Sequence, residues 1–431
     1  MVKIVVVGGG WAGCAAALAA RLAGAEVIVL ERTDMLLGAG LVGGIMLNNG
    51  RYTAAEEIIA LGGNAIFSTL EGTYRHRNIE FPGHSHASLY DVHKIETAIR
   101  ALLERHNIEI RTMNRVVAVA KEDERVTAVV TEDGETLEGD AFVDASGTSG
   151  PMGNCLRYGH GCALCVQRCP AFGPRTSLVA LAGGREYPAV KADGSYGAMS
   201  GSCKLAKDSL APFLLEKLEK NGVVEITLPP EMVNPGKLKL KVCEHYDIPV
   251  YAERIILLDT GHVKLMAPFI PLKDLRQVPG FERARFADPY AGGKGNSIRL
   301  LAMAFRNRAL KVDGLDNVFV GGEKQGPAIG HTEAIATGML AGHNAVRCAL
   351  GMEPLVLPRS LATGELIGSI SDDLERGEAG WRRYSFSGAG FFHLMREKNL
   401  YTLCRTEIRE RVAKAGLLGV YARRLIPAQE S

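Results

Sequence analysis

Strong net charge, internal repeats and long apolar segments are all missing from this sequence. Fifty Lys and Arg are balanced by 48 Asp and Glu, and the formal charge of +2 excludes an overall field that attracts nucleic acid. No fixed-period repeat or low-complexity tract is present. Residues 4–20 carry no charge, but they are few for a membrane span and include three consecutive glycines. We therefore expect neither a membrane protein nor an exported one.

The remaining composition is that of a globular protein, with 47% hydrophobic and 23% charged residues. A length of 431 residues predicts two or three domains. Fifty glycines indicate many tight turns and places where main chain approaches a ligand. The nine cysteines are odd in number, which fits a disulfide framework poorly. We expect a reducing compartment, the cytoplasm, with the cysteines serving a metal or redox site.

Hydrophobic patterns predict an α/β fold with a Rossmann-like first unit. Residues 3–8 and 26–31 have the continuous apolar character of buried parallel strands, and an Ala-rich helix is expected between them at 11–23. Apolar and polar residues alternate over 109–146, which predicts antiparallel strands. Further elements are a buried strand at 316–322, and helices at 54–61, 91–106, 331–349 and through most of the last 80 residues.

The first predicted turn carries the pattern G-x-G-x-x-G in Gly8, Gly10 and Gly13. The first glycine permits the turn, the second lets main chain reach a pyrophosphate, and the third lets helix and strand pack closely. The phosphates would lie at the helix N-terminus, where free N–H groups and the helix dipole favour an anion. Glu31 ends the second strand and is suitably placed for ribose hydroxyls. These features predict a dinucleotide site without separating FAD from NAD.

Two later segments favour FAD. Residues 140–147, DAFVDASG, and residues 315–323, LDNVFVGGE, resemble the closing motifs of the glutathione-reductase-type FAD fold. Residues 319–345 also resemble the tRNA-modifying flavoproteins related to glucose-inhibited division protein A and to the folate-dependent tRNA uridine methyltransferase. The matching positions there are Gly330, Glu333, Ala334, Gly338, Ala341, Gly342, Asn344 and Ala345.

The resemblance implies roles for individual residues. Glu323 would bind the ribityl chain, although the fold usually has Asp there, and the following helix would point its N-terminus at the isoalloxazine ring. His331, where the tRNA-modifying group tends to have an aromatic residue, and Glu333 are the candidate catalytic residues. The expected FAD-binding set is Gly8, Gly10, Gly13, Glu31, Arg32, Val117, Gly147, Gly322, Glu323, Gly330, His331 and Thr332.

Four cysteines cluster within 15 residues as Cys155, Cys162, Cys165 and Cys169. Part of their spacing resembles that of bacterial ferredoxins, and four thiolates this close can hold a [4Fe–4S] cluster. A structural zinc, a redox-active pair of Cys162 and Cys165, and ordinary buried cysteines are the alternatives. A cluster near the flavin would supply an electron route, since no second G-x-G-x-x-G provides a built-in NAD(P)H domain.

Other polar residues are weaker candidates. His84 and His86 are expected in a solvated loop or at a helix entry rather than on a metal. Arg299, Arg306 and Arg308 are more consistent with a solvated helix face than with an acidic substrate.

The basic C-terminal helices are the last feature of note. From Arg376 to Arg424 they carry eleven Lys/Arg against four Asp/Glu, a balance of +7, with aromatic residues interleaved. They favour a cap over the core or an interface between copies, with RNA contact as the alternative.

Together these patterns predict an FAD-dependent oxidoreductase. We expect an FAD domain of residues 1–150 and 306–350, an inserted substrate domain of 151–305 that begins with the cysteines, and a helical region of 351–431. The reaction would be two-electron redox at the flavin, with electron exchange to a [4Fe–4S] cluster. Flavin-dependent modification of tRNA or rRNA uridine and an electron-transfer subunit are the alternatives. Expected partners are a small-molecule substrate or an electron-transfer protein, with RNA and a second copy of the chain as further ones.

Overall fold

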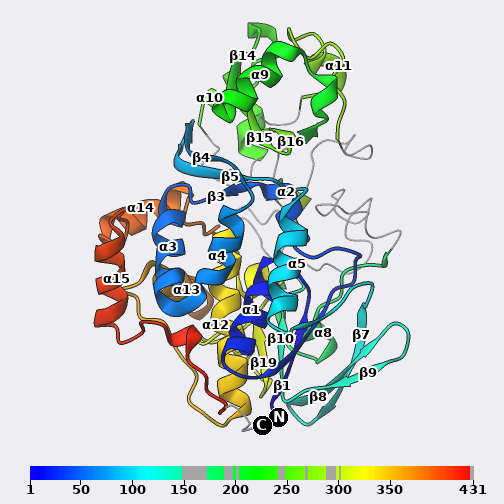
Figure 1. Ribbon diagram of the computed structural model, residues 1–431, viewed down its shortest axis with the longest axis vertical. Coiled ribbons are helices and arrows are strands. Elements are labelled where there is room, and N and C mark those ends of the chain that lie inside the picture. The colour runs from blue at the N-terminus through cyan, green and yellow to red at the C-terminus, as the bar shows by residue number, and fades with distance from the viewer. Residues whose placement is uncertain are drawn as a thin grey trace.

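The computed structural model describes residues 1–147, 172–188, 198–199, 203–240, 248–266, 270–287, 298–299 and 302–427. Figure 1 shows a large part around a parallel sheet and a smaller part around antiparallel strands. Within the described ranges, no helix is both long and apolar enough to cross a membrane.

The large part is organised by a five-stranded parallel sheet of order β19-β10-β1-β2-β6. Its strands are β1 (Lys3–Val7), β2 (Glu26–Leu30), β6 (Glu109–Arg111), β10 (Ala141–Asp144) and β19 (Val318–Val320). This confirms the α/β class. Two strands of the alternating segment 109–146 nevertheless join the parallel sheet, because a period of two reports exposure and not the direction of pairing.

Both faces of the sheet are covered, so the large part has three layers. Ile4 and Val6 pack toward the helices α1 (Trp11–Leu22), α5 (Ile95–Arg105) and α12 (His331–Ala349). Val5 and Val7 face the opposite side. That side holds a three-stranded antiparallel sheet and a short helix, namely β7 (Val116–Glu122), β8 (Arg125–Thr131), β9 (Thr136–Glu138) and α8 (Leu178–Leu181).

Helices α1 and α12 touch main chain to main chain. A Cβ added to Gly342 would lie 2.0 Å from the Ala16 carbonyl oxygen, and one added to Gly338 would lie 2.2 Å from that of Ala12. Only glycine permits this approach. The contact fixes the relative position of the two helices that the sequence assigns to the two ends of the cofactor.

The smaller part combines two antiparallel sheets. One contains β3 (Ile45–Met46), β4 (Tyr74–Phe81) and β5 (His84–Tyr90), and the other contains β13 (Cys203–Leu205), β14 (Val223–Thr227), β15 (Arg254–Thr260) and β16 (His262–Leu265). Helices α9 (Pro212–Asn221), α10 (Val250–Glu253) and α11 (Leu272–Leu275) complete it. Ala87, Leu89, Ile256 and Leu258 share one core, so the β4–β5 hairpin packs with the middle segment.

Two short strand pairs lie between these parts in the chain. They are β11 (Glu186–Pro188) with β18 (Ala302–Ala304), and β12 (Ala198–Met199) with β17 (Ile298–Arg299). The N-terminal third also supplies α2 (Gly40–Gly43), α3 (Gly50–Ile58), the π-helix η1 (Ile59–Gly63) and α4 (Asn64–Glu71). Short 3₁₀ helices complete the described elements: η2 (Lys207–Ser209), η3 (Pro230–Met232), η4 (Pro235–Leu240), η6 (Gly322–Gln325) and η7 (Val420–Ala422).

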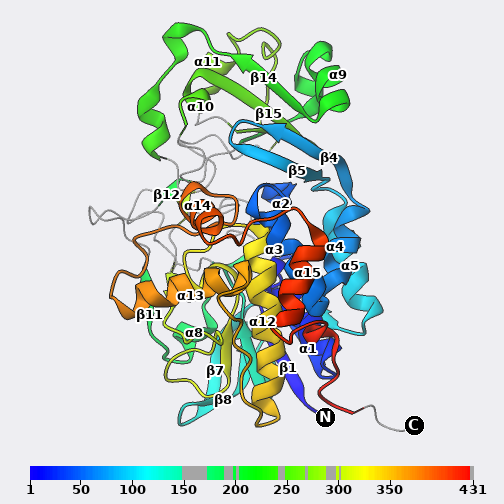
Figure 2. The same ribbon diagram turned by 90° about the vertical axis from the view of Figure 1, so that its left-hand side faces the viewer.

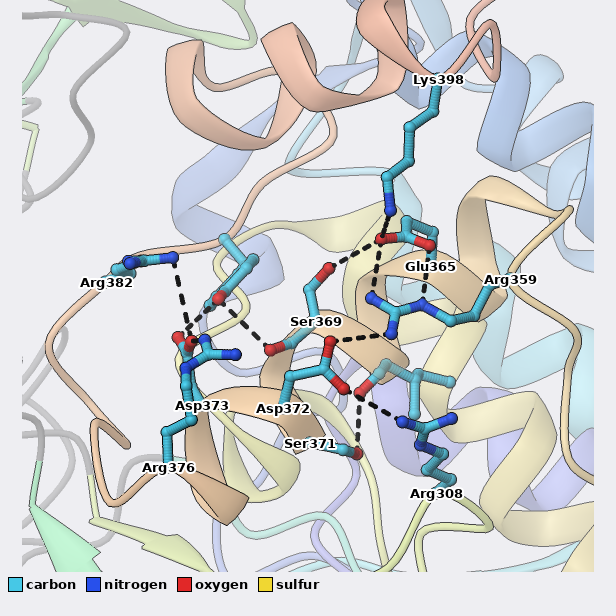
Figure 3. A network of polar contacts seen from close by, with 12 residues as sticks. Arg308, Arg359, Glu365, Ser369, Ser371, Asp372, Asp373, Arg376, Arg382 and Lys398 are labelled. Carbon is cyan, nitrogen blue, oxygen red and sulfur yellow. Dashed lines mark hydrogen bonds and ion pairs between the residues drawn. The ribbon is translucent and has the colours of Figure 1, made fainter.

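The C-terminal region is helical, as predicted. Helices α13 (Ala362–Glu375), α14 (Ala389–Glu397) and α15 (Arg405–Lys414) lie beside α3 and α12 in Figure 2. Figure 3 shows the polar network on α13, in which Arg359 donates to both oxygens of Glu365 at 2.9 Å and to Asp372 at 2.7 Å. Lys398, which directly follows α14, donates to Glu365 at 2.7 Å. These pairs attach α14 to α13.

Candidate functional site

The β1–α1 turn has the geometry that the glycine motif predicts. Gly8 has φ of +100°, and a Cβ on it would lie 2.5 Å from the Ala145 carbonyl oxygen. A Cβ on Gly13 would lie 1.8 Å from the Gly8 oxygen, so helix and strand need this glycine to pack. Gly10 differs, because an added Cβ would meet no described atom within 4 Å. The Cα of Gly10 therefore faces a space that no described atom fills.

The amino end of α1 is suited to an anion. Gly10 is its N-cap, no described side chain caps it, and its first turn has no acidic residue. Its first N–H groups are therefore available to phosphate oxygens.

Glu31 is buried at the end of β2 and accepts main-chain hydrogen bonds. Its Oε2 accepts from Gly9 N–H at 2.8 Å, and its Oε1 accepts from the N–H and hydroxyl of Thr33, both at 2.9 Å. A carboxylate has about four acceptor positions, so capacity remains for a ribose hydroxyl. The hydrogen bond to Gly9 fixes the carboxylate beside the glycine turn.

Three further predicted residues surround the same edge of the sheet. Arg32 follows β2 and donates to the Gly173 carbonyl oxygen at 2.7 Å. Gly147 follows β10 with φ of +75°, and an added Cβ would again meet no described atom within 4 Å. Val117 is half-buried in β7 and lies three residues after Asn114. The Asn114 N–H donates to the Glu31 carbonyl oxygen at 2.9 Å, which brings the start of β7 to this edge.

The late motif places a second helix start against α1. Gly322 has φ of +67°, its N–H donates to Thr337 Oγ1 at 2.9 Å, and an added Cβ would lie 3.0 Å from the Ala12 side chain. Glu323 is half-buried in the turn η6. Gly330 is the N-cap of α12, and no side-chain cap is seen among the described residues. Thr332 in the first turn is fully buried.

His331, the first residue of α12, lies beside the first residue of α1. Its ring centroid is 6.1 Å from that of Trp11 and 5.8 Å from that of Tyr90. The Tyr90 hydroxyl lies 3.3 Å from His331 Nδ1 and donates to the Gly40 carbonyl oxygen. A Cβ on Gly43 would lie 1.7 Å from His331 Cε1, so α2 lies directly against the imidazole.

Glu333 is fully buried and forms an ion pair with Arg51 of α3 at 3.1 Å. Its Oε1 also accepts from the Ser385 hydroxyl at 2.9 Å and from Phe386 N–H at 2.8 Å. Arg51 donates onward to the Ile329 carbonyl oxygen at 3.2 Å. These contacts favour a role in positioning the start of α12, and catalysis by Glu333 stays a prediction.

Arg51, Trp11 and Tyr90 were missed by sequence reasoning. An acidic residue in the first turn is already favoured by the helix dipole, so Glu333 alone does not indicate a cationic partner. No local pattern identifies a partner 282 positions away in the chain.

Two expectations about polar residues are wrong. The segment with His84 and His86 is strand β5 and not a loop, and His84 is buried with Nδ1 2.8 Å from Asn48 Nδ2. Burial, with Arg51 nearby, lowers the pKa of His84 to about 3. Arg306 is buried rather than solvated and donates to the Gln325 carbonyl oxygen at 2.9 Å. Arg308 pairs with Asp372 at 3.0 Å.

The predicted metal ligands Cys155, Cys162, Cys165 and Cys169 lie outside the described residues. In the described part of the chain, no group of three or more His, Cys, Asp or Glu is arranged to hold a metal. The cysteine site therefore stays a prediction.

Known proteins are similar in sequence to this chain over both the β1–α1 turn and the start of α12. The chain is 26% identical over 425 residues to the tRNA uridine 5-carboxymethylaminomethyl modification enzyme MnmG of Alkaliphilus metalliredigens, covering 86% of this chain and 65% of that protein. It is 37% identical over 100 residues to the methylenetetrahydrofolate–tRNA-(uracil-5-)-methyltransferase TrmFO of Moorella thermoacetica, which is 22% of each protein. The chain thus spans less than two thirds of the length of either relative.

The structure of Aquifex aeolicus GidA has the same fold, with a TM-score of 0.63 and 19% identity over 97% of this chain and 76% of that one. The profile of the family described as glucose inhibited division protein A matches residues 3–209 and 267–353, more than half of the chain. That match includes both the β1–α1 turn and the start of α12. The chain therefore belongs to the glucose inhibited division protein A family.

Proposed function

We propose that this protein is an FAD-dependent enzyme that modifies uracil bases of tRNA. The observation that carries the proposal is the meeting of two uncapped helix starts, with Trp11 and His331 in ring contact, in a chain of this family. The printed activities of the relatives, MnmG and TrmFO, both concern tRNA uridine or uracil.

The residues present fit FAD. An added Cβ at Gly10 or Gly147 would meet no described atom within 4 Å, and a pyrophosphate beside the α1 N-terminus would accept main-chain hydrogen bonds there. Glu31, held by Gly9, would orient the ribose, and the start of α12 would lie at the isoalloxazine end. When bound, FAD supplies the two-electron redox chemistry. His331 would orient the substrate base or hold a proton at Nδ1 or Nε2.

The C-terminal region supports an RNA substrate by its position. Phe386 lies within the basic region, and its N–H donates to Glu333 in the first turn of α12, so this part of the region lies beside the proposed reaction centre. Arg382 and Arg405 expose 64% and 69% of their side chains; each is paired with a carboxylate, Asp373 and Glu56, but its guanidinium group remains within reach of phosphates from solvent. RNA contact is thereby favoured over a cap without a ligand.

Substitution of Gly10 tests FAD binding. Gly10 has φ of −67°, which alanine adopts freely, and its Cβ would meet no described atom. Gly10→Ala should therefore fold normally and lose FAD affinity by at least about tenfold, because the methyl group would lie against the pyrophosphate. Gly72→Ala is the matched control, since its Cβ would have an ordinary 3.5 Å contact. Equal flavin absorbance in both purified variants would contradict the proposed site.

The substrate is tested with the holoenzyme. Transcribed tRNA is incubated with protein, a reductant and methylenetetrahydrofolate, and its nucleosides are analysed by mass spectrometry. We expect a mass increase confined to uridine, together with tRNA affinity that falls steeply with salt. A flavin-loaded protein that neither binds nor alters tRNA would refute RNA modification while leaving FAD binding intact.

The cysteine spacing favours a second candidate, an oxidoreductase of small molecules or an electron-transfer subunit with a [4Fe–4S] cluster. Iron, sulfide and zinc analysis of anaerobically purified protein separates the possibilities. About four irons per chain would support the cluster, whereas zinc without iron would support a structural site.

A further inference from the structure

A pair of histidines lies where the smaller part of the molecule meets the start of α5. His93 lies between β5 and α5, and His262 begins β16 after the tight β15–β16 turn. Their Nε2 atoms are 3.0 Å apart. The Val92 N–H donates to the Thr260 carbonyl oxygen at 3.0 Å, which fixes the two segments against each other.

We propose that His93 and His262 bind a divalent transition-metal ion of the Cu²⁺, Ni²⁺ and Zn²⁺ class through their Nε2 atoms. Water would complete the coordination sphere, because the pair supplies two ligands. Metal–nitrogen bonds of about 2.0–2.1 Å to two nitrogens 3.0 Å apart enclose an angle of roughly 95° at the ion. That angle is typical of the square-planar and octahedral sites of Cu²⁺ and Ni²⁺.

The ring arrangement suits ligation. The ring centroids are 4.2 Å apart with an interplanar angle of 77°, so the imidazoles meet at an angle rather than end to end. Two converging ligands of one ion would place the ring centroids about 4.7 Å apart and a straight N–H···N hydrogen bond about 5.3 Å apart, so the observed separation lies nearer to ligation and a small ring rotation would complete it.

Asp91 provides the support that metal-bound histidines usually have. Its Oδ1 lies 3.3 Å from His93 Nδ1 and accepts from His93 N–H at 2.9 Å. A carboxylate on Nδ1 fixes the ring and directs the Nε2 lone pair outward. Gly261, with φ of +98°, brings the hairpin against this pair, since a Cβ there would lie 2.7 Å from His93 Nδ1.

The histidine pair is also accessible from solvent. His93 exposes about half of its side chain, 54%, which leaves the pair accessible to an ion from solvent. A bound ion would join the β15–β16 hairpin to the start of α5.

The test is a calorimetric titration of the full-length, untagged protein with Ni²⁺. The cysteines at 155–169 can take the same ion, so the readout is the difference between wild type and His262→Gln. We expect the variant to lose one equivalent of Ni²⁺, and Asp91→Asn to weaken that equivalent by about 10–100-fold. His86→Gln, which removes a half-buried histidine of β5 outside the pair, is the control and should keep that equivalent.

Spectroscopy checks that the variants are folded and identifies the atoms that bind the metal. Far-UV circular dichroism should be the same for wild type, His262→Gln and His86→Gln, because both histidines are only half-buried. Cu²⁺ bound to a cysteine-blocked sample should give an electron paramagnetic resonance spectrum with coupling to two nitrogens, absent from His262→Gln. Equal Ni²⁺ stoichiometry in wild type and His262→Gln would overturn the proposal, as would a Cu²⁺ signal without nitrogen coupling.

Discussion

The contact between α1 and α12 leads to a quantitative prediction for Gly342→Ala. The new Cβ would lie 2.0 Å from the Ala16 carbonyl oxygen, whereas real Cβ contacts are essentially never below 3.0 Å. The obstructing atom is main chain, so no side chain can rotate away. The two helices must therefore separate by about 1 Å at this point, which is overpacking of a dense core.

The magnitude follows from two opposing effects. Overpacking costs about 1–3 kcal/mol or more, while alanine gains about 1 kcal/mol over glycine in helix propensity. Because the clash here is among the most severe of the glycines, we expect a net loss of about 2 kcal/mol in the free energy of unfolding. FAD affinity should fall as well, since the two helix starts would no longer meet at their present spacing.

Urea denaturation of the apoprotein measures the stability, and flavin absorbance after gel filtration measures retention. Gly72→Ala has the same chemistry with room for the methyl group and should change neither quantity. If Gly342→Ala unfolds at the same urea concentration as the control and keeps its flavin, main-chain contact between the helices is not what fixes the site.

Three further predictions concern buried charged and titratable groups. Glu333→Gln should lower the free energy of unfolding by about 3 kcal/mol, since it leaves Arg51 buried without its charge partner. Urea denaturation measures this loss, and a value below about 1 kcal/mol would contradict the prediction. His343 is fully buried in α12, and burial lowers its pKa to about 4. The unfolded chain therefore takes up this proton first, and about 3 kcal/mol of stability is lost as the pH falls from 6.5 to 4. Urea midpoints across this range should depend less on pH in His343→Leu, and unchanged dependence would refute the assignment. Glu57→Gln should lower the free energy of unfolding by about 1–2 kcal/mol, because the Glu57 carboxylate accepts from two N–H groups at the start of α13. An unchanged midpoint in thermal or urea unfolding would show that this cap is dispensable.

The first βαβ unit could be predicted from sequence because its signals are local. A continuous apolar run, three glycines and an acidic strand end all occur within residues 3–31, and β1, α1 and β2 follow them closely. The late strand and helix at 318–349 were equally evident.

The support of the site could not be predicted, because it depends on contacts between distant segments. Arg51 and Phe386 reach Glu333 from positions 282 and 53 residues away. The segment FPGHSHASLYD reads as a loop, but Pro82 and Gly83 form only the turn between β4 and β5, and His84 begins β5. Burial then depends on which sheet the hairpin packs against, and a local pattern does not contain that information.

The packing of the β4–β5 hairpin limits how the molecule can be divided. Ala87 and Leu89 come from the N-terminal third, yet their neighbours Ile256 and Leu258 come from the middle of the chain. A recombinant exchange of residues 203–287 between family members would leave the hairpin facing foreign side chains. Chimeras should therefore fold only when residues 74–90 are transferred along with the middle segment, because the side chains that pack against each other then come from the same protein.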